Sequence, residues 1–267
     1  SSMKKYLVIG NPIEHSLSPK LHNYWIAENN INAIYEKKKL DNKDLNDLIL
    51  GIKESKIHGL NVTIPFKKDI INYLDKLSNE SEKTQSVNTI YLKDNKVYGH
   101  NTDIEGFKLS IKKTKYDVTN KKVLILGAGG VVPSIIFSLY KMKASKIIVS
   151  NRTKDNAISL KNLFKDIIIV DWGEIPDVDM IINATSIGLN KNDELNIDFS
   201  KITNDKFFYD IIYNPKETNF LKVSKKLGNK SQNGTMMFIY QAFAAFKIWH
   251  GISPLINDKV IKLIEND

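Results

Sequence analysis

The sequence contains no cysteine, which excludes a disulfide framework and a thiolate zinc site. It has no run of about eighteen apolar residues and no signal-peptide pattern at its start, so we expect no membrane span and a cytoplasmic location. Its histidines lack the spacing of paired metal ligands, and we therefore expect no bound metal. The five histidines are His15, His22, His58, His100 and His250.

Arginine is almost absent as well. Arg152 is the only arginine, and lysines supply the other basic groups that bring the net charge to +9 at pH 7. These lysines are spread along the whole sequence instead of forming one basic segment, so we expect no nucleic-acid partner. A diffuse positive field does favour anionic small molecules. The length of 267 residues and a hydrophobic content of 42% suffice for one large domain or two modest ones.

One segment, residues 121–153, has the pattern of a nucleotide-binding unit. The apolar run Val123–Leu126 predicts a buried strand, and the turn Gly127-Ala128-Gly129-Gly130 follows it directly. Val131–Met142 has helical apolar spacing, and Lys146–Val149 predicts a second buried strand. In such a βαβ unit, a pyrophosphate binds the free N–H groups at the start of the helix.

The end of the second strand indicates which nucleotide is bound. An NAD enzyme usually carries Asp or Glu there, but this strand leads into Asn151-Arg152-Thr153, without a carboxylate. The planar guanidinium of Arg152, beside hydroxyl and amide groups, suits a 2′-phosphate and so favours NADP. The glycine match is partial, because Val132 replaces the third glycine of G-x-G-x-x-G. A solvated charge at the strand end is the alternative interpretation of Arg152.

Strands alternate with helices along the rest of the chain too, which predicts an α/β fold. Two series of strands, separated by a helix at 102–115, predict two lobes with a cleft between them. We expect Ser18 to cap a helix that begins at Pro19. We expect Pro65 to open another helix, with Lys67 in its first turn.

Several polar residues lie at the ends of these elements, where binding and catalytic sites are usually built. Each also has a purely structural interpretation, for example Ser18 as a helix cap and Asn88 as a turn former. The set comprises Ser16, Ser18, Thr63, Lys67, Asn88, Asp103 and Gln241.

The motifs that contain these residues together resemble those of the shikimate dehydrogenase family, from Tyr6 to about Gly251. So many motifs in the family's order are hard to obtain by chance. In chain order they are Gly10 to Pro19, His22-Asn23, Asn61 to Lys67, Val87-Asn88-Thr89, Asn101 to Gly106, Gly127 to Gly130, Asn151-Arg152-Thr153, Asn183 to Gly188, Asp210 to Pro215 and Gln241-Ala242.

The resemblance implies an NADPH-dependent oxidoreductase that reversibly reduces 3-dehydroshikimate to shikimate in aromatic amino-acid (chorismate) biosynthesis. It implies that Ser16 and Ser18, helped by Tyr213, bind the substrate carboxylate. The residues it assigns to the ring oxygens are Thr63, Lys67, Asn88, Asp103 and Gln241. Lys67 is the expected general acid/base and Asp103 orients it, because an ammonium group can stabilise and then protonate a developing alkoxide. Whether Lys67 or a water molecule transfers the proton stays open.

The implied cofactor is NADP(H). The family often has a second basic residue four positions after the motif arginine, where this chain has Asn156. Lys154 is the candidate substitute, so the expected preference for NADP over NAD is weaker than usual. The expected cofactor-binding residues are Gly127, Ala128, Gly129, Gly130, Asn151, Arg152, Thr153, Thr185 and Ser186.

The resemblance also implies a substrate domain at 3–102 plus 237–267 and an NADP-binding domain at 103–236. The expected partner is a small-molecule substrate, and a homodimer is left open. One alternative is a quinate/shikimate dehydrogenase that accepts NAD or NADP. Another is a non-catalytic NADP-binding regulator, although such a sensor would need neither Lys67 nor Asp103.

Overall fold

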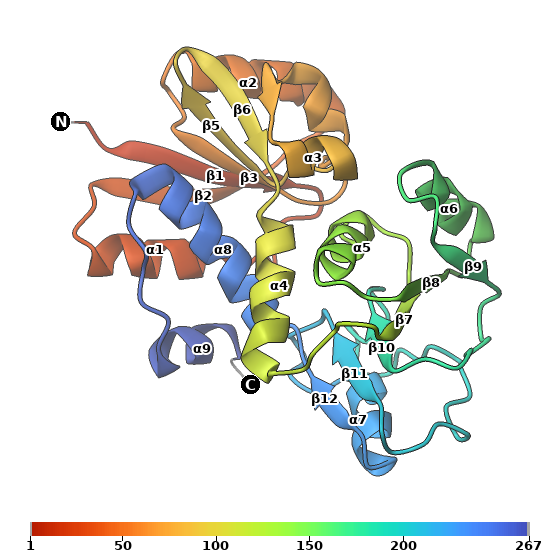
Figure 1. Cartoon of the computed structure of the whole chain (residues 1–267). Coiled ribbons are helices and arrows are strands. Elements are labelled where there is room, and N and C mark those ends of the chain that lie inside the picture. Colours follow the sequence, from red (N-terminus) through yellow and green to blue (C-terminus); the bar gives the residue numbers. More distant parts are fainter. Residues whose placement is uncertain (1, 266–267) are drawn as a thin grey trace. The chain divides into compact units, whose positions relative to one another are not determined.

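The structure, a computed structural model, describes residues 2–265, which divide into two compact units. One unit comprises residues 2–106 and 239–263, and the other comprises residues 107–238 with 264 and 265 (Figure 1). Each unit is built on its own six-stranded sheet. No helix formed by the described residues is long and apolar enough to cross a membrane.

The sheet of the first unit is mixed. Its order is β2-β1-β3-β5-β6-β4, with β1, β2 and β3 parallel and β5 antiparallel to both β3 and β6. Asp94 and Asn95 join β5 to β6 with φ values of 51° and 60°, the left-handed conformation that a two-residue hairpin turn requires. The strands are β1 (Lys4–Gly10), β2 (Ala33–Lys39), β3 (Gly59–Val62), β4 (Lys76–Leu77), β5 (Thr89–Lys93) and β6 (Lys96–His100).

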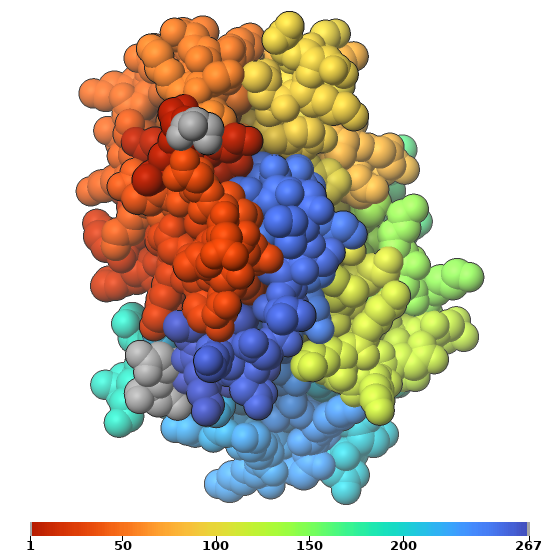
Figure 2. All heavy atoms as spheres, turned by 90° about the vertical axis from the view of Figure 1, so that its left-hand side faces the viewer, coloured from red at the N-terminus to blue at the C-terminus, as the bar shows by residue number. Residues whose placement is uncertain are grey.

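Helices cover both faces of this sheet because successive side chains of a strand point to opposite sides. Leu7 and Ile9 of β1 pack in one apolar cluster with α2 (Leu45–Lys53). Tyr6 points to the other face, where its ring lies 5.0 Å from that of Trp249 in α8 (Thr235–His250). Helix α1 (Ser18–Glu28) lies beside α8 on this face, and Figure 2 shows the two segments, near the red and blue ends of the colour scale, in contact.

The second unit has a fully parallel sheet of order β12-β11-β10-β7-β8-β9. This is the doubly wound arrangement, in which strands are added first on one side of β7 and then on the other, so the strand order reverses between β7 and β10. Ligands of such sheets bind beyond the carboxyl ends of the strands at this reversal. The strands are β7 (Lys122–Leu126), β8 (Lys146–Ser150), β9 (Ile168–Val170), β10 (Met180–Asn183), β11 (Phe207–Asp210) and β12 (Lys230–Gln232).

The predicted α/β fold is therefore confirmed, with strands alternating with helices in both units. Apolar clusters lie on the two faces of the second sheet, one of them against α5 (Val132–Lys141) and the other against α7 (Asn219–Lys226). The remaining helices are α3 (Asn79–Thr84), α4 (Thr102–Thr114), α6 (Lys154–Ser159) and α9 (Asp258–Ile264). Short 3₁₀ turns are formed by Asn42–Asp44, Asp69–Tyr73 and Leu160–Asn162.

Two of the expected helix starts are wrong. Helix α1 already includes Ser18, and its N-cap is Leu17, which provides no side-chain cap. The Ser18 N–H donates to the hydroxyl of Ser16 (3.3 Å). Pro65 does not open a helix. It lies in a turn that the Phe66 N–H closes by donating to the Thr63 carbonyl (3.0 Å), and regular structure resumes only at the 3₁₀ turn that begins at Asp69.

An aromatic cluster between the sheet and α1 contains an unusual histidine. The His22 ring stacks on Tyr35 at 4.3 Å, with an angle of 1° between the rings. His22 is 1% exposed, and neither of its ring nitrogens has a hydrogen-bond partner within the described residues. Burial, reinforced by His250, lowers the pKa of His22 to about 3, so the ring stays neutral in the folded state.

We predict that His22 makes the fold acid-sensitive. Unfolded chains protonate histidine near its ordinary pKa of 6.5, whereas the folded state does so only near 3, so stability falls as the pH falls between these values. At pH 5 the loss is about 2 kcal/mol. Urea unfolding of the wild type and of His22→Phe at pH 7 and pH 5 measures it, and the variant should lose less stability on acidification.

The matched control is His15→Phe, since His15 is exposed. This variant should keep the acid sensitivity of the wild type. An equal loss in the wild type and in His22→Phe would show that His22 is not its source.

Candidate active site

Six of the expected site residues lie at one edge of the first sheet. β1 and β3 are parallel, so their carboxyl ends lie together, and the antiparallel β5 begins at the same edge. Residues that follow β1, β3 and β6, or that precede β5, are therefore brought together. They are Ser16, Ser18, Thr63, Lys67, Asn88 and Asp103.

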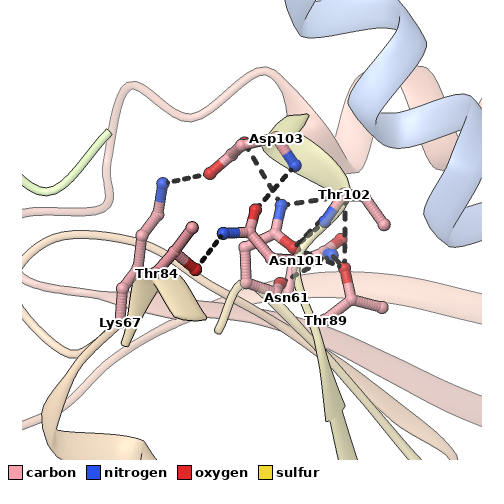
Figure 3. Close-up of polar contacts among 8 residues, drawn as sticks. Asn61, Lys67, Thr84, Thr89, Asn101, Thr102 and Asp103 are labelled. Carbon is pink, nitrogen blue, oxygen red and sulfur yellow. Dashed lines mark hydrogen bonds and ion pairs between the residues drawn. The ribbon is translucent and has the colours of Figure 1, made fainter. Parts of the chain in front are cut away.

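At the centre of this edge, Lys67 and Asp103 form an ion pair. The ammonium Nζ of Lys67 donates to Oδ2 of Asp103 at 2.6 Å (Figure 3). The two side chains are only 15% and 9% exposed, so water screens this pair far less than a surface pair. Removing one partner would leave the other as a nearly buried, unpaired charge, which is strongly unfavourable.

The backbone around Lys67 is fixed from two sides. The Lys67 carbonyl accepts a hydrogen bond from the N–H of Val87 (2.9 Å), and the turn at Pro65 holds the preceding residues. Lys67 is thus positioned by a bond to a neighbouring segment and not by a helix, which corrects the expectation from the sequence.

Asp103 lies in the first turn of α4. The Asn101 carboxamide oxygen accepts the Asp103 N–H (3.0 Å), which satisfies one of the free N–H groups of the helix start. The carboxylate also lies at the N-terminal end of α4, which is the positive end of the helix dipole. Asp103 is therefore held by its backbone, by its helix and by Lys67.

The Asn88 carboxamide binds both Thr102, at the start of α4, and the Asp103 carboxylate. Its oxygen accepts the Thr102 N–H at 2.7 Å, and its Nδ2 group donates to the Thr102 hydroxyl (2.9 Å) and to Oδ1 of Asp103 (3.2 Å). Both protons on Nδ2 are used within the protein. Asn88 is 3% exposed, so a substrate oxygen would have to share one of these protons.

Several supporting residues were not predicted from the sequence. Asn61 donates from Nδ2 to the Asn88 carbonyl and to the Thr89 hydroxyl, both at 3.1 Å, and Asn101 donates to the Thr84 hydroxyl at 3.2 Å (Figure 3). The available signal was a polar residue in an otherwise apolar strand, since Asn61 lies in β3 between Leu60 and Val62.

Other expected substrate residues lie in different surroundings. Ser18 is 8% exposed and contacts the Tyr35 hydroxyl, whereas Ser16 is half-buried. Gln241 is half-buried on α8, in the first unit. Tyr213 belongs to the second unit, where its ring packs 4.7 Å from that of Phe238, and burial raises its pKa to about 12. Its phenol is thus a neutral donor at ordinary pH.

The expected nucleotide residues follow β7, β8 and β10, three neighbouring strands of the second sheet. Gly127 has a φ of 113°, and a Cβ atom there would lie 2.9 Å from the Ala184 carbonyl oxygen, so only glycine fits. A Cβ at Gly129 or Gly130 would meet nothing within 4 Å. The backbone after β7 therefore combines a tight turn with open space at the start of α5, which suits a pyrophosphate.

Arg152 is exposed just after β8. Its guanidinium lies 5.5 Å from the centre of the Trp172 ring and donates to the Glu194 carbonyl at 3.2 Å. These contacts orient the planar group while most of its five N–H donors stay available. Asn151 is occupied locally, because its Nδ2 group donates to the Thr153 carbonyl at 2.8 Å.

The loop after β10 is built on buried polar groups. Thr185 donates from its hydroxyl to Oδ1 of Asn183 (2.6 Å), and Asn183 donates to Oδ1 of Asp210 (3.2 Å). Burial raises the pKa of Asp210 to about 6, despite the hydrogen bonds that it accepts. The Thr185 proton is thus committed within the loop, whereas Ser186 is exposed.

The candidate for a second phosphate contact has another partner. Lys154 forms an ion pair with Asp171 at 2.7 Å, and both side chains are more than half exposed. Asn156 is exposed. Among residues 2–265 there is no group of three or more His, Asp or Glu side chains that could hold a metal ion.

The chain is similar to known proteins along nearly its whole length. Residues 8–90 match the family model "Shikimate dehydrogenase substrate binding domain", and residues 108–217 match "Shikimate / quinate 5-dehydrogenase". The shikimate dehydrogenase (NADP(+)) of Pelagibacter ubique (strain HTCC1062) is 62% identical over 262 residues, which cover 98% of this chain and 99% of that protein.

Solved structures are similar as well. The crystal structure of shikimate dehydrogenase from Aquifex aeolicus has a TM-score of 0.90 and 38% identity, and the match covers 99% of this chain and 98% of that one. Shikimate 5-dehydrogenase from Thermus thermophilus, in complex with NADP(H) and shikimate, has a TM-score of 0.88 and 27% identity, with 98% of each chain covered.

Proposed function

The chain belongs to the shikimate dehydrogenase family, and we propose that it catalyses the reversible, NADPH-dependent reduction of 3-dehydroshikimate to shikimate in aromatic amino-acid biosynthesis. The observation that carries this function is the partly buried ion pair of Lys67 and Asp103. It combines a proton donor with the carboxylate that orients it.

We assign substrate binding to residues 3–102 with 237–267, of which 266 and 267 lie outside the described residues, and NADP binding to residues 103–236. The backbone at Gly127, Gly129 and Gly130 would hold the pyrophosphate. Further candidates for the nucleotide are Ala128, Asn151, Arg152, Thr153, Thr185 and Ser186. NADPH, when bound, supplies the hydride.

Lys67 acts on the ketone oxygen of the substrate. As the carbonyl is reduced, negative charge develops on this oxygen, and a nearby ammonium group stabilises that charge. Lys67 has three N–H donors, of which Asp103 takes one, so two remain for the oxygen and its protonation. Asp103 fixes the direction of the ammonium before the substrate binds, and its free lone pairs accept from a substrate hydroxyl.

Recognition of the substrate carboxylate falls to Ser16 and Ser18 at the start of α1, with Tyr213 as a further donor. Short hydroxyl groups suit a carboxylate because they donate without adding bulk. We assign the ring oxygens to mixed donor and acceptor groups, as a polyol requires. These groups are Thr63, Lys67, Asn88, Asp103 and Gln241.

The reaction itself separates this proposal from its alternatives. Absorbance at 340 nm is followed with shikimate or quinate, each paired with NADP or NAD. We expect the highest kcat/KM with shikimate and NADP. A preference for quinate or for NAD would indicate the quinate/shikimate dehydrogenase, and no reduction in any of the four mixtures would indicate the regulator.

We further propose that the enzyme works in the cytoplasm as a homodimer. The absence of cysteine fits a reducing compartment. β9 lies at an edge of the second sheet, and Ile168 in this strand is an exposed apolar side chain. Light scattering of the purified chain decides between monomer and dimer.

If Lys67 transfers the proton, Lys67→Ala should lower kcat by about 10²- to 10⁴-fold, while KM for shikimate changes less. Lys67→Met should be equally impaired, because it keeps the length but cannot donate a proton. Steady-state kinetics of both variants measure this. Lys68→Ala is the control, since Lys68 is exposed in the same turn. A near-normal kcat with a raised KM would return proton transfer to water.

If Arg152 reads the 2′-phosphate, Arg152→Ala should weaken NADP binding by roughly 10- to 150-fold, the effect of losing one charged hydrogen bond. NAD binding should be almost unchanged, because NAD lacks this phosphate. Fluorescence titration with both nucleotides measures the change. Lys154→Ala should alter NADP binding by less than about threefold, since its ammonium pairs with Asp171. Equal losses for NADP and NAD would contradict the assignment.

A further inference from the structure

Tyr35 is held rigidly beside the candidate active site. It is the one buried residue of β2, at 1% exposure. The Asn23 carboxamide binds its backbone on both sides, accepting the Tyr35 N–H at 3.0 Å and donating to the Tyr35 carbonyl at 2.8 Å. The residue before Asn23, His22, stacks on the Tyr35 ring. Two consecutive residues of α1 thus fix the backbone and the ring of Tyr35.

The Tyr35 hydroxyl has a defined direction. It lies 2.7 Å from Oδ1 of Asn61, whose Nδ2 group contacts the Asn88 carbonyl. A carbonyl only accepts, so the Asn61 amide cannot be turned round, and its oxygen must face Tyr35. The phenol proton is therefore committed to Asn61, and the phenol oxygen is left as an acceptor towards Ser18.

From Asn61 the bonds continue in the same direction. Asn61 donates to the Thr89 hydroxyl (3.1 Å), which donates to Oδ1 of Asn88 (3.0 Å). The Asn88 oxygen also accepts a backbone N–H, so this amide is fixed as well and its Nδ2 group faces Asp103. Each member of this hydrogen-bond chain, from Tyr35 to Asp103, donates to the next. Figure 3 labels Asn61, Thr89 and Asp103 of the chain, together with Lys67, which donates to Asp103.

We propose that Tyr35 and Asn61 are positioning residues for the reaction, because their hydrogen bonds orient Asn88 and, through it, the Asp103 carboxylate that holds Lys67. This inference rests on the proposed dehydrogenase function. Tyr35, Asn61 and Thr89 lie behind the residues assigned to the substrate and are 1%, 6% and 0% exposed, so they act through Asn88 rather than by contact. Such a chain stiffens the site because each bond restricts the next one.

The hydrogen-bond chain predicts different effects of one variant on kcat and on substrate binding. Tyr35→Phe removes the donor to Asn61 and so loosens Asn88 and Asp103. It also removes the acceptor that competes for the Ser18 proton, which leaves that proton free for the substrate carboxylate. We therefore expect kcat to fall by roughly tenfold, as for one weakened hydrogen bond in the transition state. Because these two effects on substrate binding oppose each other, KM for shikimate should change by less than about twofold.

The test compares Tyr35→Phe with Thr89→Val, which interrupts the chain at its middle with a side chain of nearly the same shape. Tyr98→Phe is the control, because the Tyr98 ring stacks on Tyr91 and Tyr98 is not a member of the hydrogen-bond chain. Kinetics are measured on the folded fraction, and Tyr35→Phe is repeated in an Asp103→Asn background. There it should change kcat by less than about twofold, because the group that it positions is gone.

A purely structural role gives a different result. Tyr35→Phe would then lower the stability but leave kcat of the folded enzyme unchanged, or it would reduce kcat by the same factor in both backgrounds. Either result for kcat overturns the inference. The side-chain amide ¹⁵N–¹H resonances of Asn88 provide a readout without substrate. They should shift in Tyr35→Phe and in Thr89→Val but not in Tyr98→Phe, so they test the chain even if the wild type fails to oxidise shikimate.

Discussion

The ion pair between Lys67 and Asp103 is the interaction on which the candidate active site depends. Two charges at 2.6 Å, both mostly out of water, require firm positioning to remain paired. The Asp103 carboxylate has a further partner in Asn88 and lies at the start of α4, and a bond from Val87 to the Lys67 carbonyl holds the Lys67 backbone in place. The turn after β3, the start of β5 and the start of α4 must therefore all be in place before the pair can form.

In each of the two units, a buried asparagine binds a threonine and an aspartate. In the first unit, the buried Asn88 binds a threonine and Asp103, and in the second, the buried Asn183 binds a threonine and Asp210. In both cases an asparagine at the edge of a sheet organises the loop beyond it. The carboxylates differ in their use: Asp103 faces an ammonium group, whereas Asp210 has only neutral donors and its pKa is raised to about 6.

Much of this architecture could be predicted from the sequence, because strands and tight turns leave local patterns. The βαβ unit with Gly127 and the exposed Arg152 after its second strand are examples. The wrong predictions rested on local sequence patterns, which contacts with distant residues override. Pro65 resembles a helix start, but a bond from Val87 holds Lys67 outside a helix. The partners of Asn61 are 26 to 28 residues away in sequence, and no local pattern reports them.

The central claim is that Lys67 and Asp103 act as one unit. A double-mutant cycle of Lys67→Met and Asp103→Asn, measured as kcat for shikimate oxidation, tests it most directly. If the two residues act as one unit, removing the second after the first lowers kcat little further. The double variant is then about as slow as the slower single variant. If the two losses multiply instead, Lys67 and Asp103 contribute independently, and the account of the ion pair is wrong.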